Sequence, residues 1–377
     1  MMARLEEICA INMGQSPDSS TYNEDGNGLP FFQGNADFGE IYPAVRMWCS
    51  EPTKIAREKD ILISVRAPIG ALNIANCECC IGRGLAALTV NEDICAQEYL
   101  WHVLSGKVDE LNSKGTGSKF KAINKKTLSE TEIPLPPIDE QRKIAAVLDK
   151  VSGLIAKRRQ QLDRLDELVK SRFIEMFGDP VQNPLRWTKR PLLEMGYCKN
   201  GMNFHTGDSG IEMYCLGVGD FKDHSVIDGT DCLPTVSLNE APPEESMLRD
   251  GDIVFVRSNG NKALVGRCLV VYPHSTPTTY SGFCIRYRLT SDDVNTAYLL
   301  RVLKTDSMRK MMAGRGANIQ NLNQQILATL NVPIPPKELQ EQFASFVAQT
   351  DKSKLAVQQG LQELEILKKS LMQEYFE

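Results

Sequence analysis

One nine-residue phrase occurs twice in the chain. Residues 133–141 read IPLPPIDEQ and residues 332–340 read VPIPPKELQ, which places the two copies 199 positions apart. The Pro-x-Pro-Pro core cannot continue a strand or a helix, because proline lacks the backbone N–H and fixes φ. Each copy is therefore expected to mark a domain boundary, and a duplicated boundary indicates a duplicated architecture.

The repeat extends upstream of this phrase. With the same offset, GTGSKFKAINKKTL (115–128) aligns with GRGANIQNLNQQIL (314–327), and EYLWHVL (98–104) aligns with AYLLRVL (297–303). Further toward the N-terminus the offset falls to 192 between Asp60 and Asp252, and to 183 between Gly34 and Gly217. The second copy therefore carries extra residues, which we expect to lie in loops on a shared scaffold.

Each copy divides into a globular part and a long helix. The parts at 1–132 and 182–331 contain short apolar runs at 61–65 and 253–256, which predict buried strands between turns. The segments at 133–181 and 332–377 continue past their prolines into helices predicted at about 138–177 and 337–376. The expected fold is a mixed α/β fold with a pseudo-two-fold internal repeat, in which two strand-rich domains are each followed by a long helix.

Both predicted helices carry apolar side chains at heptad spacing. Such a helix is roughly 60 Å long at 1.5 Å per residue. Each globular part is only roughly 30 Å across, so it cannot cover the apolar positions along the whole helix. We expect the two helices to pack on each other as an antiparallel coiled coil with the domains at opposite ends; the alternative is that each helix docks on its own domain. The expected packing positions are Leu148, Val151, Ile155, Leu162, Leu165, Val169, Val357, Leu361, Leu364 and Leu371.

Composition is typical of a globular cytoplasmic protein. Apolar residues make up 42% and charged residues 24%, no stretch is long and apolar enough to span a membrane, and the N-terminal MMARLEEICAINMG lacks a signal core. The eleven cysteines are expected to be free thiols, and Cys77, Cys79 and Cys80 lack the paired C-x2-C spacing of zinc sites, so no metal is expected. Because the net charge is −5, a polyanion could bind this chain only at a local basic patch.

The sequence offers no catalytic constellation. GTGSK (115–119) has its glycines in the wrong places for a phosphate-binding loop, and GVGDF (217–221) lacks the third glycine of a dinucleotide-binding turn. NPLR (183–186) departs from the Asn/Asp-Pro-Pro-aromatic pattern of base methyltransferases. His102 is replaced by Arg301 in the second copy and is expected at the surface. We therefore expect neither an active site nor a cofactor in this chain.

Several phrases together resemble a known family. PLPPIDEQ and its looser copy PIPPKELQ, the helix ends RFIEMFGDPVQNP and KKSLMQEYF, and the phrases QGNADF and VGDF are similar to those of the specificity subunit of type I restriction-modification systems. The resemblance extends over nearly the whole chain. It implies a non-catalytic subunit with two target-recognition domains for double-stranded DNA and two conserved spacer helices. It also implies partners: two methyltransferase subunits, which hold S-adenosylmethionine and methylate the DNA, and restriction subunits.

This architecture also predicts the form of the DNA target. Two readers on a rigid spacer contact two short half-sites and leave the base pairs between them unread. Unequal loops in the two copies read unequal half-sites, because specificity comes from side chains on base edges. The expected target is therefore bipartite and asymmetric.

Candidate DNA contacts are polar or basic side chains beside glycines and at strand ends. Arg, Asn and Gln read bases by bidentate hydrogen bonds, while Lys and Arg neutralise phosphates. The base-reading candidates are Gln33, Asn35, Arg66 and Arg83 in the first domain and Lys222, Arg257, Asn259 and Lys262 in the second; Lys119, Lys121 and Arg315 are the candidates for phosphate contact. For each of them a structural or solvated role is the alternative.

Some aligned residues have structural explanations. Arg66 and Arg257 align as the residues that close equivalent strands. Asp37 and Asp220 also align and could hold turns rather than face DNA, and Asn124 and Asn323 are expected to cap the short helices that follow them.

Two other functions compete with DNA recognition by a specificity subunit. One is a methyltransferase that acts on DNA without partners. The other is a coiled-coil scaffold whose globular domains bind protein, which the net negative charge favours.

Overall fold

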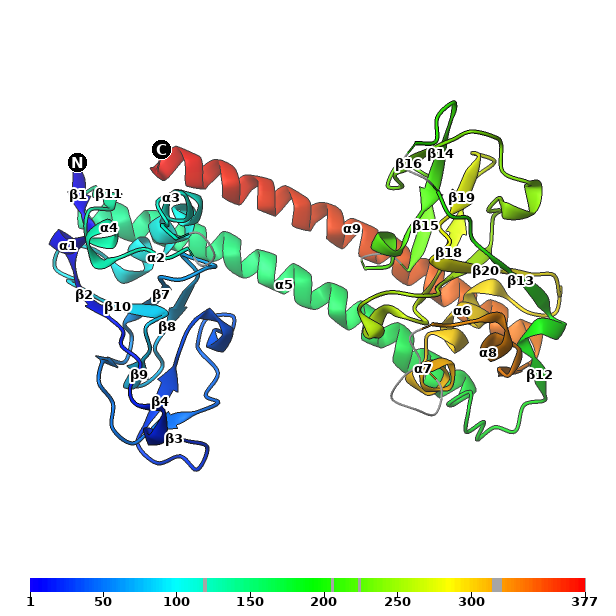
Figure 1. Cartoon of the computed structure of the whole chain (residues 1–377), viewed down its shortest axis with the longest axis horizontal. Helices are drawn as coiled ribbons and strands as arrows, with labels where there is room; N and C mark the ends of the chain where they lie inside the picture. Colours follow the sequence, from blue (N-terminus) through cyan, green and yellow to red (C-terminus); the bar gives the residue numbers. More distant parts are fainter. Residues whose placement is uncertain (118–120, 205–206, 223–224, 314–320, 377) are drawn as a thin grey trace. The chain divides into compact units, whose positions relative to one another are not determined.

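The computed structural model describes residues 1–117, 121–204, 207–222, 225–313 and 321–376, which form two compact units (Figure 1). Residues 1–160 and 358–377 make up the first unit, and residues 161–357 make up the second. The two long helices are α5 (Ile138–Phe177) and α9 (Lys337–Phe376), as predicted, and each contributes residues to both units. Each unit is described below by itself.

The first unit is built on an antiparallel four-stranded sheet in the order β2-β10-β7-β8. The strands are β2 (Cys9–Met13), β10 (Leu85–Val90), β7 (Ile61–Ser64) and β8 (Leu72–Ile74). A second sheet, β3-β5-β4-β9-β6, is made of β3 (Tyr22–Asn23), β5 (Trp48–Cys49), β4 (Leu29–Phe32), β9 (Cys79–Ile81) and β6 (Ile55–Ala56). β7 is buried on both faces, because Ile61 and Ile63 pack with the helices while Leu62 packs with Phe32 of the second sheet.

Short helices and a two-stranded ribbon complete the first unit. The helices are α1 (Leu5–Ile8), α2 (Gln97–Gly106), α3 (Val108–Ser113) and α4 (Lys125–Ser129), and β1 (Met2–Arg4) pairs with β11 (Glu132–Pro134) just before α5. Leu148 of α5 lies in the same buried cluster as Tyr99 and Leu104 of α2. The start of α5 is therefore part of the core of this unit.

The second unit repeats this plan with a fifth strand in its main sheet. Its main sheet has the order β13-β20-β17-β18-β15, with β13 (Gly196–Asn200), β20 (Cys284–Leu289), β17 (Asp252–Val256), β18 (Cys268–Tyr272) and β15 (Val226–Asp228). Its smaller sheet is β16 (Thr235–Leu238), β14 (Ile211–Leu216) and β19 (Thr278–Tyr280), and β12 (Lys189–Pro191) pairs with β21 (Asn331–Pro333). The helices α6 (Thr296–Leu303), α7 (Asp306–Ala313) and α8 (Gln324–Ala328) correspond to α2, α3 and α4. The duplication seen in the sequence is therefore a duplication of fold.

The glutamine that ends each proline phrase explains why the phrase occurs twice. Gln141 accepts a hydrogen bond from the backbone N–H of Ala96 at 2.9 Å, and Gln340 accepts one from Asn295 at 2.8 Å. The amide group of each also donates to two carbonyls, one in the loop before α2 or α6 and one in the proline phrase. Both glutamines are fully buried. Each one clamps the start of a long helix to its domain.

Turns and helix starts are duplicated as well. Asp37 accepts from the backbone N–H of Gln33 at 2.8 Å, and Asp220 accepts from Gly217 at 2.8 Å, so both aspartates hold turns. The helix caps were predicted correctly, since Asn124 and Asn323 accept from backbone N–H groups at the starts of α4 and α8 at 2.9 and 2.8 Å.

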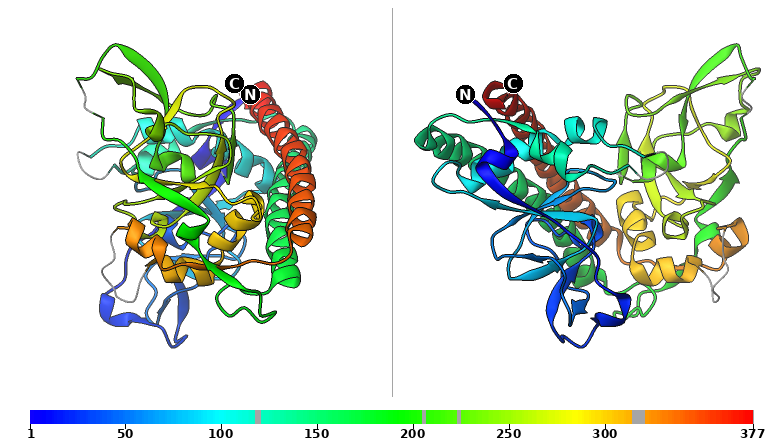
Figure 2. Two further views of the ribbon diagram at one scale, coloured as in Figure 1. Left: turned by 90° about the vertical axis from the view of Figure 1, so that its right-hand side faces the viewer. Right: turned by 60° about the vertical axis from the view of Figure 1, so that its left-hand side comes forward.

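Within each unit the portions of α5 and α9 run antiparallel, and Figure 2 shows the two helices side by side. In the second unit Lys354 Nζ lies 2.6 Å from Asp166 Oδ1, and the ring centroids of Phe173 and Phe343 lie 5.5 Å apart. The residue further along α5 thus contacts the residue earlier in α9, as in an antiparallel pair. In the first unit Arg159 donates to Glu365 at 2.8 Å. Among the expected packing positions, Leu148, Val151, Ile155, Val169 and Val357 are buried, and Leu162, Leu165, Leu361, Leu364 and Leu371 are half-buried.

The expectation that His102 lies at the surface is wrong, since the side chain is 2% exposed. Helix α2 packs against α5, and His102 Nε2 lies 2.7 Å from Asp149 Oδ1. Burial lowers the pKa of His102 below its ordinary value, and the hydrogen bond to Asp149 opposes this shift only in part. A neutral imidazole at neutral pH is the consequence.

All eleven cysteines are free, as predicted. Burial raises the pKa of Cys9, Cys79 and Cys95 to about 12, so these thiols stay protonated and unreactive at neutral pH. None of the helices in the described ranges is long and apolar enough to cross a membrane.

Candidate nucleic-acid interface

In the first unit, backbone hydrogen bonds bring two segments with predicted contacts to one end of β7. The N–H of Gly84 donates to the carbonyl of Gln33 at 3.2 Å, and the carbonyl of Gly84 accepts from Val65 at 2.9 Å. Gln33 is exposed. Arg83, which precedes Gly84, and Arg66, which follows Val65, are exposed as well. Three predicted base-reading side chains therefore project from neighbouring backbone segments.

The segment that carries Lys121 joins the same end of the sheet. Ala67 N–H donates to the Lys121 carbonyl at 3.0 Å, and Ile123 N–H donates to the Val65 carbonyl at 2.9 Å. Lys121 is exposed. The other predicted phosphate contact in this segment, Lys119, lies outside the described residues.

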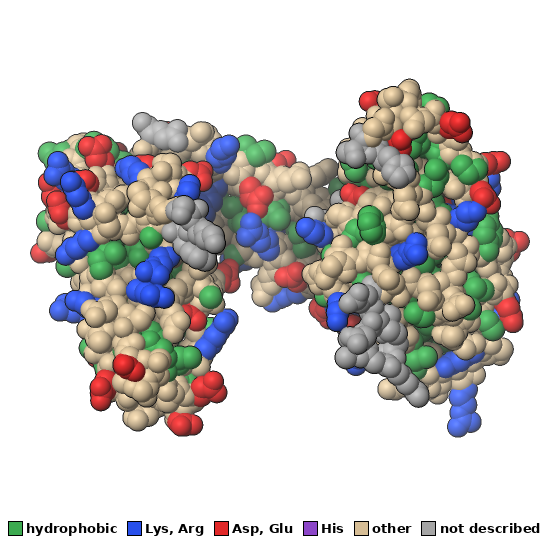
Figure 3. Space-filling view, viewed as in Figure 1, with side chains coloured by type: hydrophobic (Ala, Val, Ile, Leu, Met, Phe, Trp, Pro, Cys, Tyr) green, Lys and Arg blue, Asp and Glu red, His purple; other side chains and the backbone are tan. Residues whose placement is uncertain are grey.

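None of the described cations at this end of the first unit is paired with a carboxylate. Within the described ranges, no ion pair of this unit includes Arg66, Arg83 or Lys121. Asn35 is half-buried in the single helical turn 35–37. The carboxylate of Asp37 in this turn accepts hydrogen bonds from the backbone N–H groups of Gln33 and Gly34. On the face shown in Figure 3, Lys and Arg side chains occupy the middle of this unit, and Asp and Glu gather at its lower end. Positive charge is therefore available here to a polyanion.

In the second unit, Arg257 holds the corresponding end of β17. Its N–H donates to the Phe283 carbonyl at 2.8 Å, its carbonyl accepts from Leu322 at 2.7 Å, and its guanidinium donates to the Gly282 carbonyl at 3.3 Å. The same backbone bonds are made by Val65 in the first unit. Arg257 is half-buried and points its charge at the turn before β20.

The alignment of Arg66 with Arg257 is therefore wrong by one residue. Arg66 forms an isolated bridge with Ala122, and Ser258 forms the matching bridge with Asn321, so Ser258 is the counterpart of Arg66. The shift arises because the first strand segment holds one residue more than the second before its arginine. The two units thus present different side chains at equivalent backbone positions.

The other predicted contacts of the second unit lie in turns. Asn259 accepts from the N–H of Asn261 at 2.8 Å, and Lys262 starts the single helical turn Lys262–Leu264. Lys222 is exposed directly after the turn 218–221. Arg315 lies outside the described residues. The structure therefore places Arg257, Asn259 and Lys262 along one continuous segment, with Lys222 on another.

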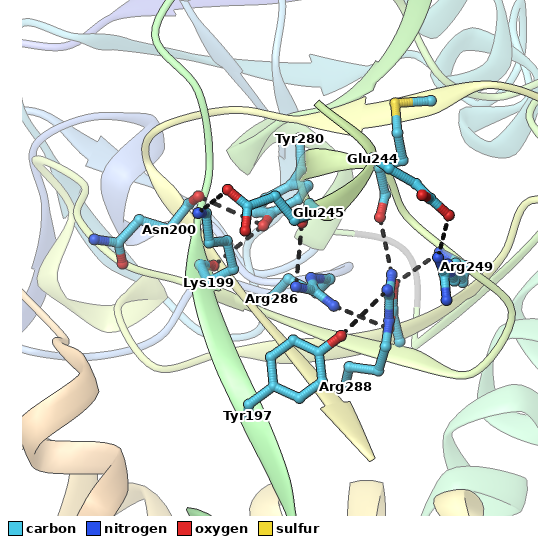
Figure 4. Close-up of polar contacts among 11 residues, drawn as sticks. Tyr197, Lys199, Asn200, Glu244, Glu245, Arg249, Tyr280, Arg286 and Arg288 are labelled. Carbon is cyan, nitrogen blue, oxygen red and sulfur yellow. Dashed lines mark hydrogen bonds and ion pairs between the residues drawn. The ribbon is translucent and has the colours of Figure 1, made fainter. Parts of the chain in front are cut away.

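A second group of cations in this unit is neutralised within the protein (Figure 4). Arg288 makes two hydrogen bonds of 2.8 Å to Asp252, and Arg249 donates to Glu244 at 2.6 Å. The guanidinium of Arg286, which is fully buried, lies 5.0 Å from the centre of the Tyr197 ring. Because Arg288 is paired with the buried Asp252 and Arg286 is covered, these two cations are not available to phosphates, whereas Arg249 pairs with Glu244 at the surface.

Within the described ranges, no group of three or more His, Cys, Asp or Glu side chains is arranged to hold a metal ion. His274 is exposed and lies 2.5 Å from Asp228, and the hydrogen bond to Asp228 raises the pKa of His274. The two units therefore present two unequal polar surfaces, each at the end of a repeated sheet.

Comparison with known proteins identifies related chains. The model of the family described as type I restriction modification DNA specificity domain matches residues 1–165 and 247–366. A protein of Methanocaldococcus jannaschii, assigned as the specificity subunit of the type I restriction enzyme MjaX, is 43% identical over 165 residues, which cover 44% of this chain and 39% of that protein. The specificity subunit of the Salmonella potsdam type I restriction enzyme StySPI is 24% identical over 293 residues, 72% of this chain and 62% of the relative.

The chain therefore spans less than two thirds of the length of these two relatives. A crystal structure of the S subunit of a type I restriction-modification system from M. genitalium has the same fold. It covers 100% of this chain and 96% of that one, with a TM-score of 0.58 and 14% identity.

Proposed function

We propose that this chain, which belongs to the type I restriction-modification DNA specificity family, is a DNA-recognition subunit that reads an asymmetric bipartite target. It positions methyltransferase and restriction subunits on that target. The observation that carries the proposal is the repetition of one scaffold with unlike side chains at its reading ends. Two half-sites of unequal sequence are what such a pair of surfaces would recognise.

The difference between the two ends is specific. At equivalent backbone positions, the first unit has Val65 and Gly84 where the second has Arg257 and Phe283. The scaffold bonds are conserved between the units, so the changed side chains are free to alter what is read. Base recognition depends on such side chains, whereas the shared scaffold fixes only their placement.

The outer faces of the long helices support docking of partner subunits. In the first unit Val147 and Leu154, seven positions apart on α5, are 40% and 42% exposed. In the second unit Leu168 and Ile174 of α5 are each 48% exposed. Neither α9 nor the domain cores cover these apolar side chains, and docked partner subunits would bury them. Helix α5 has such side chains in both units, and one methyltransferase subunit docked on each unit would give two in the complex.

Specificity subunits of this family are in general not catalytic, and we propose the same for this chain. Methyl transfer from S-adenosylmethionine then belongs to the methyltransferase subunits, and DNA cleavage to the restriction subunits. The chain's own residues contribute binding and orientation. Its net charge of −5 favours weak DNA binding by the isolated chain and firm binding only within the complex.

Reconstitution tests this proposal. The chain, its cognate methyltransferase subunits and the two together are each incubated with labelled S-adenosylmethionine and genomic DNA, and methyl transfer is measured. We expect sequence-specific methylation only from the mixture. Methylation by this chain alone, or the same methylation pattern from the methyltransferase without it, would contradict the proposal.

A further inference from the structure

Phe283 is the most exposed aromatic side chain in the part of the chain that the structure describes, with 59% of its surface in solvent. It lies in the short turn between β19 and β20, at the end of the sheet where Arg257 lies. Single exposed apolar residues are common on protein surfaces. Phe283 differs from such residues because its backbone is rigidly held and a cation lies beside it.

The turn that carries Phe283 is fixed by hydrogen bonds on both sides. The Phe283 carbonyl accepts from the N–H groups of Arg257 and Ser258 at 2.8 and 3.3 Å. The Phe283 N–H donates to Ser281 Oγ at 3.3 Å, and the N–H of Gly282 donates to the Met202 carbonyl at 2.6 Å. An aromatic ring on so well anchored a turn loses little conformational entropy on binding.

The first unit cannot carry a side chain at this place. Gly84 occupies the equivalent position, because its carbonyl accepts from Val65 as that of Phe283 accepts from Arg257. A Cβ atom on Gly84 would lie 2.4 Å from the backbone oxygen of Gln33. The aromatic projection is therefore a feature of the second unit only.

The charge beside the ring is positive. The Arg257 guanidinium donates to the Gly282 carbonyl at 3.3 Å, next to Phe283 in the chain, and no ion pair among the described residues includes it. A cation beside an exposed ring on a fixed turn suits DNA, since the cation meets a phosphate or a base edge while the ring stacks on bases.

We propose that Phe283 is a wedge of the second DNA-recognition unit that stacks on a base step of the second half-site and locally unstacks the duplex. This inference rests on the proposed function of the chain. It makes Phe283 a specificity-determining residue, because unstacking costs least at flexible pyrimidine–purine steps. The first half-site is read without such a wedge.

The test uses the complete complex of this chain with its methyltransferase subunits and a duplex that carries the methylated motif. 2-Aminopurine, which pairs with thymine, replaces in turn each adenine in or directly beside the second half-site, on either strand, except the methylated base, because methyltransferases flip their target base by themselves. The wild-type complex should raise the fluorescence at one step. Phe283→Ala should abolish that rise and weaken binding roughly ten- to hundredfold, the range of one lost base–aromatic stack. Phe283→Trp should retain both.

Leu185→Ala is the matched control, since Leu185 is 50% exposed in the same unit and lies far along the chain from the turn. It should leave binding and fluorescence unchanged. Because Phe283 is exposed, its replacement should not lower the melting temperature. The wedge is refuted if Phe283→Ala binds the motif and alters its fluorescence as the wild type does. If the wild-type complex shows no preference for the motif at all, the proposed function itself fails.

Discussion

Gln340→Ala should destabilise the second unit and leave the first unaffected. The Gln340 side chain is fully buried and makes three hydrogen bonds: its oxygen accepts from Asn295 N–H, and its amide donates to the carbonyls of Asp293 and Pro335, all at 2.8–3.1 Å. Alanine removes all three bonds and leaves a backbone N–H and two carbonyls without these partners. Gln340 and Pro335 are buried, whereas Asn295 is half-buried and Asp293 is exposed, so water replaces only part of what is lost.

The cost follows from the groups left behind. A buried polar group without a partner costs about 1–3 kcal/mol, and the two carbonyls have second lone pairs and some freedom to relax. We therefore expect the free energy of unfolding of the second unit to fall by about 2–4 kcal/mol. Since Gln340 also fixes the start of α9, we expect the first turns of α6 and α9 to be the parts that lose the most stability.

Hydrogen exchange with mass spectrometry reports the two units separately, which a single unfolding curve of a two-unit chain does not. Amides of α6 should exchange faster in Gln340→Ala, and amides of α2 should not change. Gln141→Ala should give the reverse pattern. Gln342→Ala is the matched control, because Gln342 is exposed on the same helix. Protection of α6 equal to that of the wild type in Gln340→Ala would refute the clamp.

Three further outcomes are expected. Arg257→Ala should make one position of the second half-site degenerate when methylated sites are sequenced, whereas an equal loss on all sequences would exclude base reading. Gly84→Ala should lower the melting temperature, because the new Cβ would lie 2.4 Å from the Gln33 backbone oxygen, and an unchanged melting curve would count against that geometry. Burial lowers the pKa of His102, so its contribution to stability is present above its ordinary pKa near 6.5 and is lost as the pH falls below it. In urea titrations at pH 7.5 and 5.5, His102→Gln, which still donates to Asp149, should therefore lose less stability on acidification than the wild type; an equal loss would contradict this.

The elements that rest on local chemistry could be predicted from the sequence. The bounds of α5 and α9 follow from the proline phrases and the heptads, and Asn124 and Asn323 cap helices because a side-chain oxygen at that place satisfies a free N–H. Repetition made these predictions stronger, since each feature was seen twice.

Features that depend on packing between distant segments escaped the sequence analysis. His102 is buried because α5 lies over α2, a contact that the phrase EYLWHVL does not contain. The counterpart of Arg257 is Val65, because strand pairing and not residue type sets the correspondence. Phe283 gave no signal at all, since its exposure arises from a turn held by Met202 and Arg257.

The central claim is that two unlike surfaces on one repeated scaffold read two unlike half-sites. Single-molecule sequencing of methylated bases, in cells that carry this chain and its methyltransferase, tests it most directly. We predict one motif made of two different specified parts separated by a gap of fixed length and free sequence. A single uninterrupted motif, or two identical halves arranged as a palindrome, would contradict it.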